Sequence, residues 1–134
     1  MNILLDTHIA LWSIAYSDKL PQKSLEILQD ANNTFFVSIA PIWEVAIKHS
    51  LHPEEFSMSE VEYARFISIM GFNKLSIEVK HILALRTLGR AENAPKHNDP
   101  FDRVMIAQAK SENMIFLTHD KSLPFYEEDC ICFV

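Results

Sequence analysis

Short apolar runs alternate along the chain with longer segments in which apolar residues recur at helical spacing. The short runs predict strands at residues 3–5, 34–37, 75–77, 115–118 and 131–134. The first run ends at Asp6 and Thr7, as expected for a buried strand that is followed by a turn.

Helical patterns fill the intervals between the predicted strands. Helices are expected over residues 9–16, from Pro21 to Asn32, after Ser38, over residues 58–70 and 78–88, and from Asp99 to about Asn113. Gly71 and Gly89 end two of these helices, and Pro41 suits the first turn of the helix that Ser38 can cap. The polar residues 90–98 predict a loop.

Because strand and helix alternate throughout, we expect one α/β domain over residues 1–134, with a parallel sheet of about five strands between two layers of helices.

The low glycine content excludes two kinds of phosphate-binding site. The chain has 2 glycines, Gly71 and Gly89, where an average chain of this length has roughly nine. Their spacing fits neither a P-loop nor a dinucleotide-binding fingerprint, which excludes both phosphate-binding loops.

The chain is acidic, with a net charge of −6. This balance argues against a surface that coats nucleic acid by charge alone, but it allows acidic residues to hold a metal ion. Cys130 and Cys132 are expected to be free thiols. No segment has the apolar length of a membrane span or a signal peptide, so we expect a cytoplasmic protein with no membrane partner.

Carboxylates stand just after predicted strands or near the start of helices beside them. Asp6 follows the first strand and Asp120 follows the fourth, although an aspartate at such a point often only caps a helix. Asp99 and Asp102 likewise fit an N-cap and the first turn of a helix. Glu44 is the only charged residue between positions 35 and 47.

Glu44 has a structural alternative in an ion pair with Lys48 one helical turn away. Together, however, the carboxylates fall at one edge of one sheet, where open parallel sheets bind ligands. Two bare carboxylates about 4 Å apart repel by about 4 kcal/mol at an effective dielectric constant of 20. Protonation or a cation relieves that repulsion, and oxygen ligands favour Mg²⁺ or Mn²⁺ over Zn²⁺.

Four segments carry a resemblance to PIN-domain nucleases, and most closely to toxins of VapC-type toxin–antitoxin modules. They occur in the order and spacing of that family and together cover essentially the whole chain. They are LLDTH at 4–8, SIAPIWEVAIK at 38–48, HNDPFDRVMIAQA at 97–109 and LTHD at 117–120.

The resemblance implies a three-layer α/β/α domain with strand order 3-2-1-4-5 and a Mg²⁺- or Mn²⁺-dependent endoribonuclease that cuts tRNA or rRNA. It implies that Asp6, Glu44, Asp102 and Asp120 form a catalytic, metal-binding quartet, with Asp99 as an accessory acid. A metal-activated water would attack the phosphodiester bond in line and leave 5′-phosphate and 3′-hydroxyl ends. The partners implied are a cognate inhibitory antitoxin and a second copy of the chain.

Several further residues are candidates for contact with the RNA substrate. They are the hydroxyl residues Thr7, Ser38 and Thr118, which flank the quartet, and the cations Lys48, Arg103 and Lys121 beside it. Each cation has the alternative of an ordinary surface or pairing role. His97 is expected in a solvated loop, and His119 is expected to be incidental. Trp12 and Trp43 are expected to pack in a core or an interface.

Two other functions remain open at this stage. A phosphatase could use Asp6 as its nucleophile, but His8 stands where haloacid-dehalogenase-like enzymes have a second aspartate. A PIN-like interaction module without catalysis is the other alternative, against which the intact quartet argues.

Overall fold

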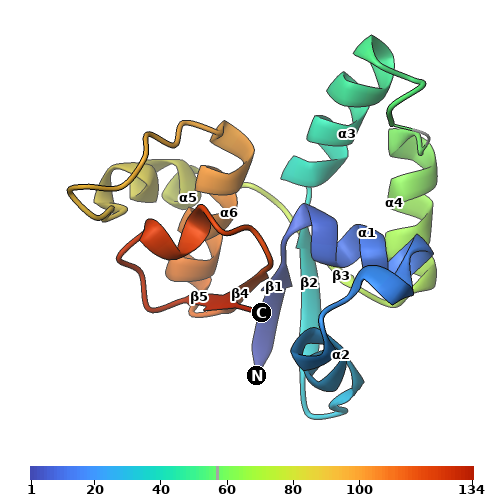
Figure 1. Ribbon diagram of the computed structural model, residues 1–134, viewed down its shortest axis with the longest axis horizontal. Coiled ribbons are helices and arrows are strands. Elements are labelled where there is room, and N and C mark those ends of the chain that lie inside the picture. The colour runs from blue at the N-terminus through green and yellow to red at the C-terminus, as the bar shows by residue number, and fades with distance from the viewer. Residues whose placement is uncertain (57) are drawn as a thin grey trace.

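A five-stranded parallel sheet forms the centre of the molecule, with helices against both faces (Figure 1). This computed structural model describes residues 1–56 and 58–134. The strands are β1 (Asn2–Leu5), β2 (Thr34–Ser38), β3 (Asn73–Leu75), β4 (Ile115–Thr118) and β5 (Ile131–Phe133). Their order is β3-β2-β1-β4-β5 and every neighbouring pair is parallel, which confirms the predicted α/β class and strand order.

Alternate side chains of β1 enter two different cores. Ile3 and Leu5 belong to a cluster that includes Ile9 of α1 (Thr7–Ala15) and Ile67 of α4 (Glu60–Ile69). Leu4 belongs to the cluster of α6 (Pro100–Glu112) on the other face. This alternation follows from the period of two in a strand and makes β1 the centre of a three-layer fold.

The remaining helices complete the two layers. They are α2 (Gln22–Gln29), α3 (Ala40–Leu51) and α5 (Val79–Ala84), with short 3₁₀ turns at Ser17–Lys19, Leu85–Thr87 and Leu123–Phe125. Helix α5 packs against α6, and α3 packs against α4. Figure 1 shows α5 and α6 on one side of the sheet and α1 and α4 on the other.

Helix boundaries follow local capping chemistry. Asp6, Ser59 and Asp99 each accept hydrogen bonds from backbone N–H groups at the start of α1, α4 and α6. Asn113 ends α6 in the left-handed conformation, with φ 58°, and Gly71 follows α4 with φ 76°. The caps of α1 and α6 are therefore made by two of the candidate site carboxylates.

The predicted third strand was misplaced by two residues. It spans Asn73–Leu75 instead of residues 75–77, because β3 is an edge strand that pairs only with β2 and tolerates polar, exposed residues. The helix predicted over residues 78–88 is also shorter, since α5 ends at Ala84 and a 3₁₀ turn follows. Ser38 does accept a hydrogen bond from the backbone N–H of Ala40, although Ile39 occupies the cap position of α3.

Both cysteines are free thiols. Within the described part of the chain, the helices are too short or too polar to cross a lipid bilayer.

Candidate functional site

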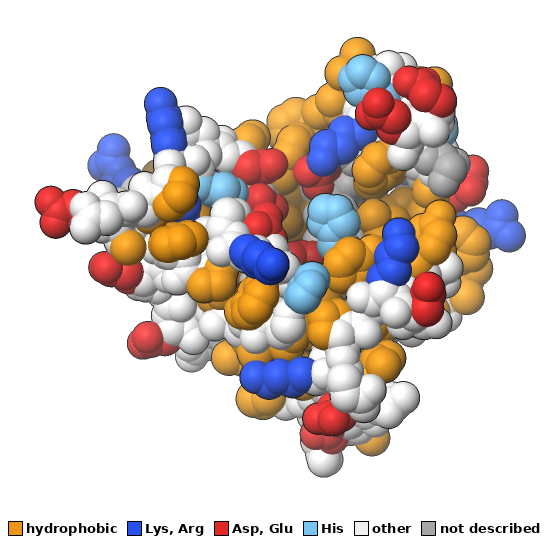
Figure 2. Space-filling model, viewed as in Figure 1, with side chains coloured by type: hydrophobic (Ala, Val, Ile, Leu, Met, Phe, Trp, Pro, Cys, Tyr) orange, Lys and Arg blue, Asp and Glu red, His pale blue; other side chains and the backbone are white. Residues whose placement is uncertain are grey.

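Five carboxylates from distant parts of the sequence surround one small cavity at the carboxyl edge of the sheet. Asp6 follows β1 and Asp120 follows β4, which are the neighbouring strands between which the strand order reverses. The cavity has a volume of about 110 Å³ and is lined by Asp6, Thr7, His8, Glu44, Lys48, Asp99, Asp102 and Asp120. Figure 2 shows acidic side chains in a hollow between two lobes, with histidine and basic side chains at its margin.

Asp6 is the most firmly held of these carboxylates and only 4% exposed. Its Oδ1 accepts hydrogen bonds from the backbone N–H groups of His8, at 2.8 Å, and Ile9, at 3.0 Å, while Oδ2 accepts one from the Thr118 hydroxyl. Burial raises the pKa of Asp6, and the hydrogen bond from Thr118 opposes that effect. A carboxylate whose two oxygens are both engaged is a poor nucleophile, which argues against the phosphatase alternative.

Glu44 enters the same cavity from α3 and is 6% exposed. Thr7 Oγ1 donates a hydrogen bond to its Oε1 at 3.1 Å, and Lys48 Nζ lies 3.0 Å from its Oε2. The ion pair proposed as an alternative to a functional role is therefore present, within the lining of the acidic cavity.

Asp102 is a second carboxyl group of this set whose pKa is raised. Burial, followed by the charges of Asp99, Asp6, Glu44 and Asp120, raises its pKa to about 8. Each of those four carboxylates therefore lies close enough to oppose ionisation of Asp102. Without a cation, Asp102 carries a proton at neutral pH.

Asp99 and Asp120 combine a structural role with a place in the cavity wall. Asp99 Oδ1 accepts hydrogen bonds from the N–H groups of Phe101, at 2.9 Å, and Asp102, at 3.2 Å, as the predicted cap requires. Asp120 Oδ1 accepts from the backbone N–H of Ser122 at 2.8 Å and from its hydroxyl at 2.7 Å. Both carboxylates also line the cavity.

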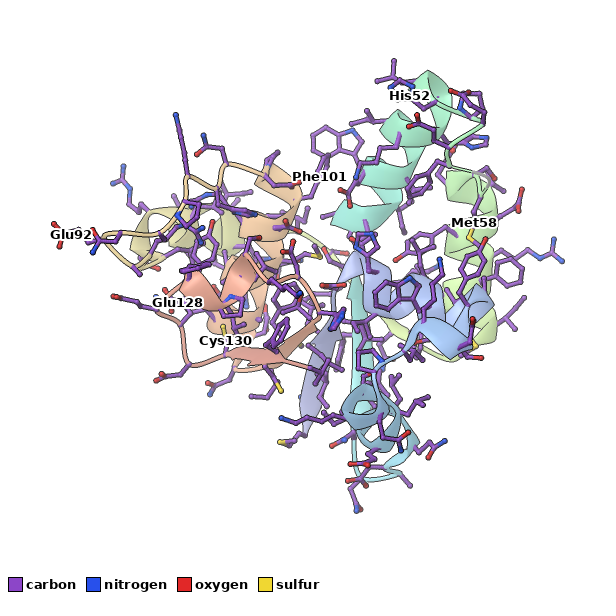
Figure 3. All side chains as sticks on the ribbon, viewed as in Figure 1. His52, Met58, Glu92, Phe101, Glu128 and Cys130 are labelled. Atoms are coloured by element: carbon purple, nitrogen blue, oxygen red, sulfur yellow. The ribbon has the colours of Figure 1, made fainter. Side chains whose placement is uncertain are left out.

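An aromatic contact joins the two sides of the cavity. Phe101 extends from the start of α6 toward α3 (Figure 3), and its ring centroid lies 5.2 Å from that of Trp43. This contact ties α6, which carries Asp102, to α3, which carries Glu44.

The hydroxyl side chains expected to contact substrate are instead turned into the protein. Thr7 and Thr118 donate to Glu44 and Asp6, and both are buried. Ser38 has no exposed surface. Ser38 and Thr118 are therefore inaccessible to RNA, whereas Thr7 lines the acidic cavity, where its hydroxyl orients Glu44.

The three candidate cations differ in how exposed they are and in how far their charged groups are already bonded within the protein. Arg103 donates to the Tyr126 hydroxyl at 3.2 Å and to the backbone carbonyl of Leu85 at 3.3 Å, so its guanidinium is used within the protein. The Lys48 side chain is half exposed beside Glu44, and Lys121 is exposed. Only these two lysines have geometry compatible with phosphate contact.

Sequence reasoning missed one neighbour of the quartet. His97 is partly buried, and its Nε2 lies 3.2 Å from Asp102 Oδ2 while its Nδ1 lies 2.8 Å from the Tyr126 hydroxyl. Its position five residues before Asp102 was a usable signal. Tyr126 offered none, because it lies 24 residues beyond Asp102 in sequence and nothing local marks it.

The donor set of the cavity fits a hard divalent cation. Among the charged groups that line it, carboxylate oxygens predominate, and burial together with the charges of its neighbours holds the pKa of Asp102 far above its usual range. The buried Tyr63 hydroxyl lacks a hydrogen-bond partner among the described residues, and the charges of Asp6 and Glu44 help to raise its pKa.

The ring of carboxylates is open. Among the residues described, no three of them bring one oxygen each within 4.8 Å of one another. An ion here would therefore keep water ligands unless side chains moved, and Mg²⁺ commonly keeps several waters in protein sites.

The chain matches one protein family and is similar in fold to several solved structures. Residues 3–127 match the family model described as PIN domain. A chain in the crystal structure of VapBC2 from Rickettsia felis, bound to a promoter DNA fragment, is similar with a TM-score of 0.69 and 20% identity over 100% of this chain and 99% of that one. No curated protein sequence shows significant similarity.

Two further structures are similar at lower scores. A chain of DNA-bound VapBC from Salmonella typhimurium has a TM-score of 0.64 and 14% identity, covering 99% of this chain and 98% of that one. A chain of FitAcB from Neisseria gonorrhoeae has a TM-score of 0.55 and 17% identity, covering 90% and 88%. At these identities the structural likenesses support the fold alone.

Proposed function

Because this chain belongs to the PIN-domain family, whose members are typically Mg²⁺-dependent nucleases, we propose that it is a metal-dependent endoribonuclease and the toxin of a VapC-type toxin–antitoxin module. Its reaction is hydrolysis of a phosphodiester bond in a structured RNA, tRNA or rRNA. One observation carries the proposal: five carboxylates from four sequence segments line one cavity, where burial and then the charges of the other four raise the pKa of Asp102 to about 8.

The residues that hold the cation are Asp6, Glu44, Asp102 and Asp120, with Asp99 as an accessory ligand. A divalent cation in this site supplies a water of lowered pKa as the nucleophile and neutralises charge that develops on the scissile phosphate. Thr118 and the N–H groups at the start of α1 fix Asp6, and Thr7 and Lys48 fix Glu44, so these two side chains need little reorganisation.

An acidic cavity in an acidic protein repels RNA unless cations reverse the local charge. Proton loss from Asp102 on metal binding completes a negatively charged ligand set, which the bound cation then offsets. We assign contacts with phosphates of the RNA to Lys48, which lines the cavity, and to Lys121, which follows Asp120 in the sequence.

The proposed protein partners are a cognate antitoxin and a second copy of this chain. The similar chains in VapBC and FitAcB come from structures that are named as two-component assemblies. This chain carries exposed apolar side chains along α3, among them Trp43 and Leu51, which are 62% and 67% exposed. Exposed apolar side chains in a row favour contact with another protein.

The test is cleavage of total tRNA and of a structured RNA in Mg²⁺ and again with excess EDTA. Asp102→Asn is the inactive variant. Its matched control is Asp129→Asn, which changes an exposed aspartate that does not line the cavity. We expect cutting that requires Mg²⁺, leaves 5′-phosphate ends and disappears in Asp102→Asn only. Equal cutting by both variants would indicate a contaminating nuclease. Metal binding without cutting of any RNA would favour the catalytically silent module.

A further inference from the structure

A second cavity, lined by rings and a lysine, lies directly beside the acidic one. It has a volume of about 390 Å³ and is lined by His8, Trp12, His119, Asp120 and Lys121. His8 and Asp120 also line the acidic cavity, so the two hollows adjoin. We call this second hollow the ring cavity.

The rings of this cavity are inclined to one another. The Trp12 ring centroid lies 5.7 Å from that of His8 at an interplanar angle of 51°, and 5.8 Å from that of His119 at 64°. The His119 ring stacks on Phe133 of β5 at 5.6 Å and 8°, and its Nδ1 contacts the carbonyl oxygen of Val134. The stacking on Phe133 of β5 and the contact with Val134 hold His119 in place.

Trp12 was expected to pack in a core or an interface, and its side chain is partly buried. One part of the side chain packs against the core cluster around β1, and another part lines the ring cavity. His119, expected to be incidental, forms the facing wall.

The charges around the ring cavity suit a nucleotide. Lys121 is exposed at its rim, where an ammonium group can contact a phosphate. Single-stranded nucleic acids bind where ring faces for bases lie beside cations for phosphates. A base paired within a duplex cannot enter such a hollow, because its faces are stacked on its neighbours.

Building on the nuclease proposed above, we infer that the ring cavity binds an unpaired nucleobase of the RNA adjacent to the phosphodiester bond that is cut. The bond to be cut lies over the carboxylates while the neighbouring base lies in the ring cavity, against the rings of Trp12 and His119 that line it. The substrate class is therefore RNA with an unstacked nucleotide at the cleavage position, as in a loop, and the interior of a regular helix is resistant.

Tryptophan fluorescence tests this directly. The chain has two tryptophans, so in Trp43→Phe the emission reports Trp12 alone. The probes are a single-stranded RNA octamer, an octamer duplex and an abasic phosphodiester chain of the same length, each titrated in Ca²⁺, which takes the same oxygen ligands as Mg²⁺. We expect the single strand to quench Trp12 and the other two probes to leave it nearly unchanged.

Variants supply the second measurement. Trp12→Ala is expected to raise the Kd for the single strand by about tenfold to a hundredfold, and Trp12→Phe to restore most of the affinity. Tyr16→Ala, which removes an exposed aromatic ring outside both cavities, is the matched control and should leave the Kd unchanged. A retained thermal shift on Mg²⁺ addition shows that each variant keeps its fold.

The outcomes separate this inference from the nuclease itself. Equal quenching by the abasic chain, or RNA cleavage with no response of Trp12 to any probe, would overturn the ring cavity as a base site and leave the nuclease standing. Quenching by single-stranded RNA in a protein that cuts nothing would support the base site and contradict the nuclease.

Discussion

His97 Nε2 lies 3.2 Å from Asp102 Oδ2, which makes a loop histidine the direct neighbour of a carboxylate whose pKa is raised to about 8. Burial, and then the charge of Arg90, lower the pKa of His97, so its ring is neutral at pH 7. A neutral ring has one donor and one acceptor. Nδ1 of His97 contacts the Tyr126 hydroxyl at 2.8 Å, and Arg103 donates a hydrogen bond to that hydroxyl.

This chain of hydrogen bonds predicts that His97 positions Asp102 for metal binding. His97→Ala should weaken Mn²⁺ binding by about tenfold or more, as is typical when a partner of a metal ligand is removed. His97→Gln, which keeps a donor at similar reach, should recover part of the loss. The measurement is calorimetric titration with Mn²⁺, and His49→Ala, at a partly buried histidine that does not line the acidic cavity, is the control. An unchanged Mn²⁺ affinity in His97→Ala would contradict the role.

The raised pKa of Asp102 predicts that metal binding strengthens with pH. In the folded protein the raised pKa lets the group hold its proton up to about pH 8, whereas an unfolded aspartate loses it near its ordinary pKa of 3.8. This group therefore contributes most to the stability of the metal-free protein at low pH, and the contribution is lost as the pH rises toward 8. Bound Mg²⁺ displaces the proton, so its affinity should rise by about tenfold per pH unit below pH 8 and then level off.

Thermal unfolding with and without Mg²⁺ between pH 6 and pH 9 measures this effect. The increase in melting temperature should grow with pH in the parent protein, whereas Asp102→Asn should show a smaller increase with a weaker dependence on pH, because the raised pKa of Asp6 remains. A metal-induced shift that is independent of pH in the parent protein would show that Asp102 is not the group that loses the proton.

The hydrogen bond from Thr118 to Asp6 predicts a cost to stability. Thr118 is fully buried, and besides donating to Asp6 its Oγ1 accepts the backbone N–H of Asp120 at 3.0 Å. Thr118→Val keeps the shape but leaves both groups without this partner, so the free energy of unfolding should fall by about 2 kcal/mol. Thr118→Ser retains the hydroxyl and should lose clearly less. Urea denaturation compares the two, and equal losses would attribute the effect to packing.

The sequence indicated the central features of the fold and the site because both depend on local patterns. Asp6 and Asp99 cap helices at strand ends, and caps are readable from a few residues. It misplaced β3 because Asn73 and Lys74 lie in an exposed edge strand with no hydrophobic signal. It also assigned Thr7 and Thr118 to the substrate, since the direction in which a hydroxyl points depends on contacts between segments 37 and 112 residues apart.

The last prediction concerns the apolar row along α3. Ile39, Trp43, Ile47 and Leu51 are exposed and follow one another at intervals of four residues, so they lie along one face of the helix. We expect this face to form the contact between two copies of the chain, because a symmetric dimer buries the same row from each copy. Leu51→Lys should therefore shift the protein from dimer to monomer in light scattering at micromolar concentration. Val61→Lys, at a side chain of α4 that is 69% exposed, is the matched control and should remain dimeric. A dimer that survives Leu51→Lys would leave the α3 row available to the antitoxin instead.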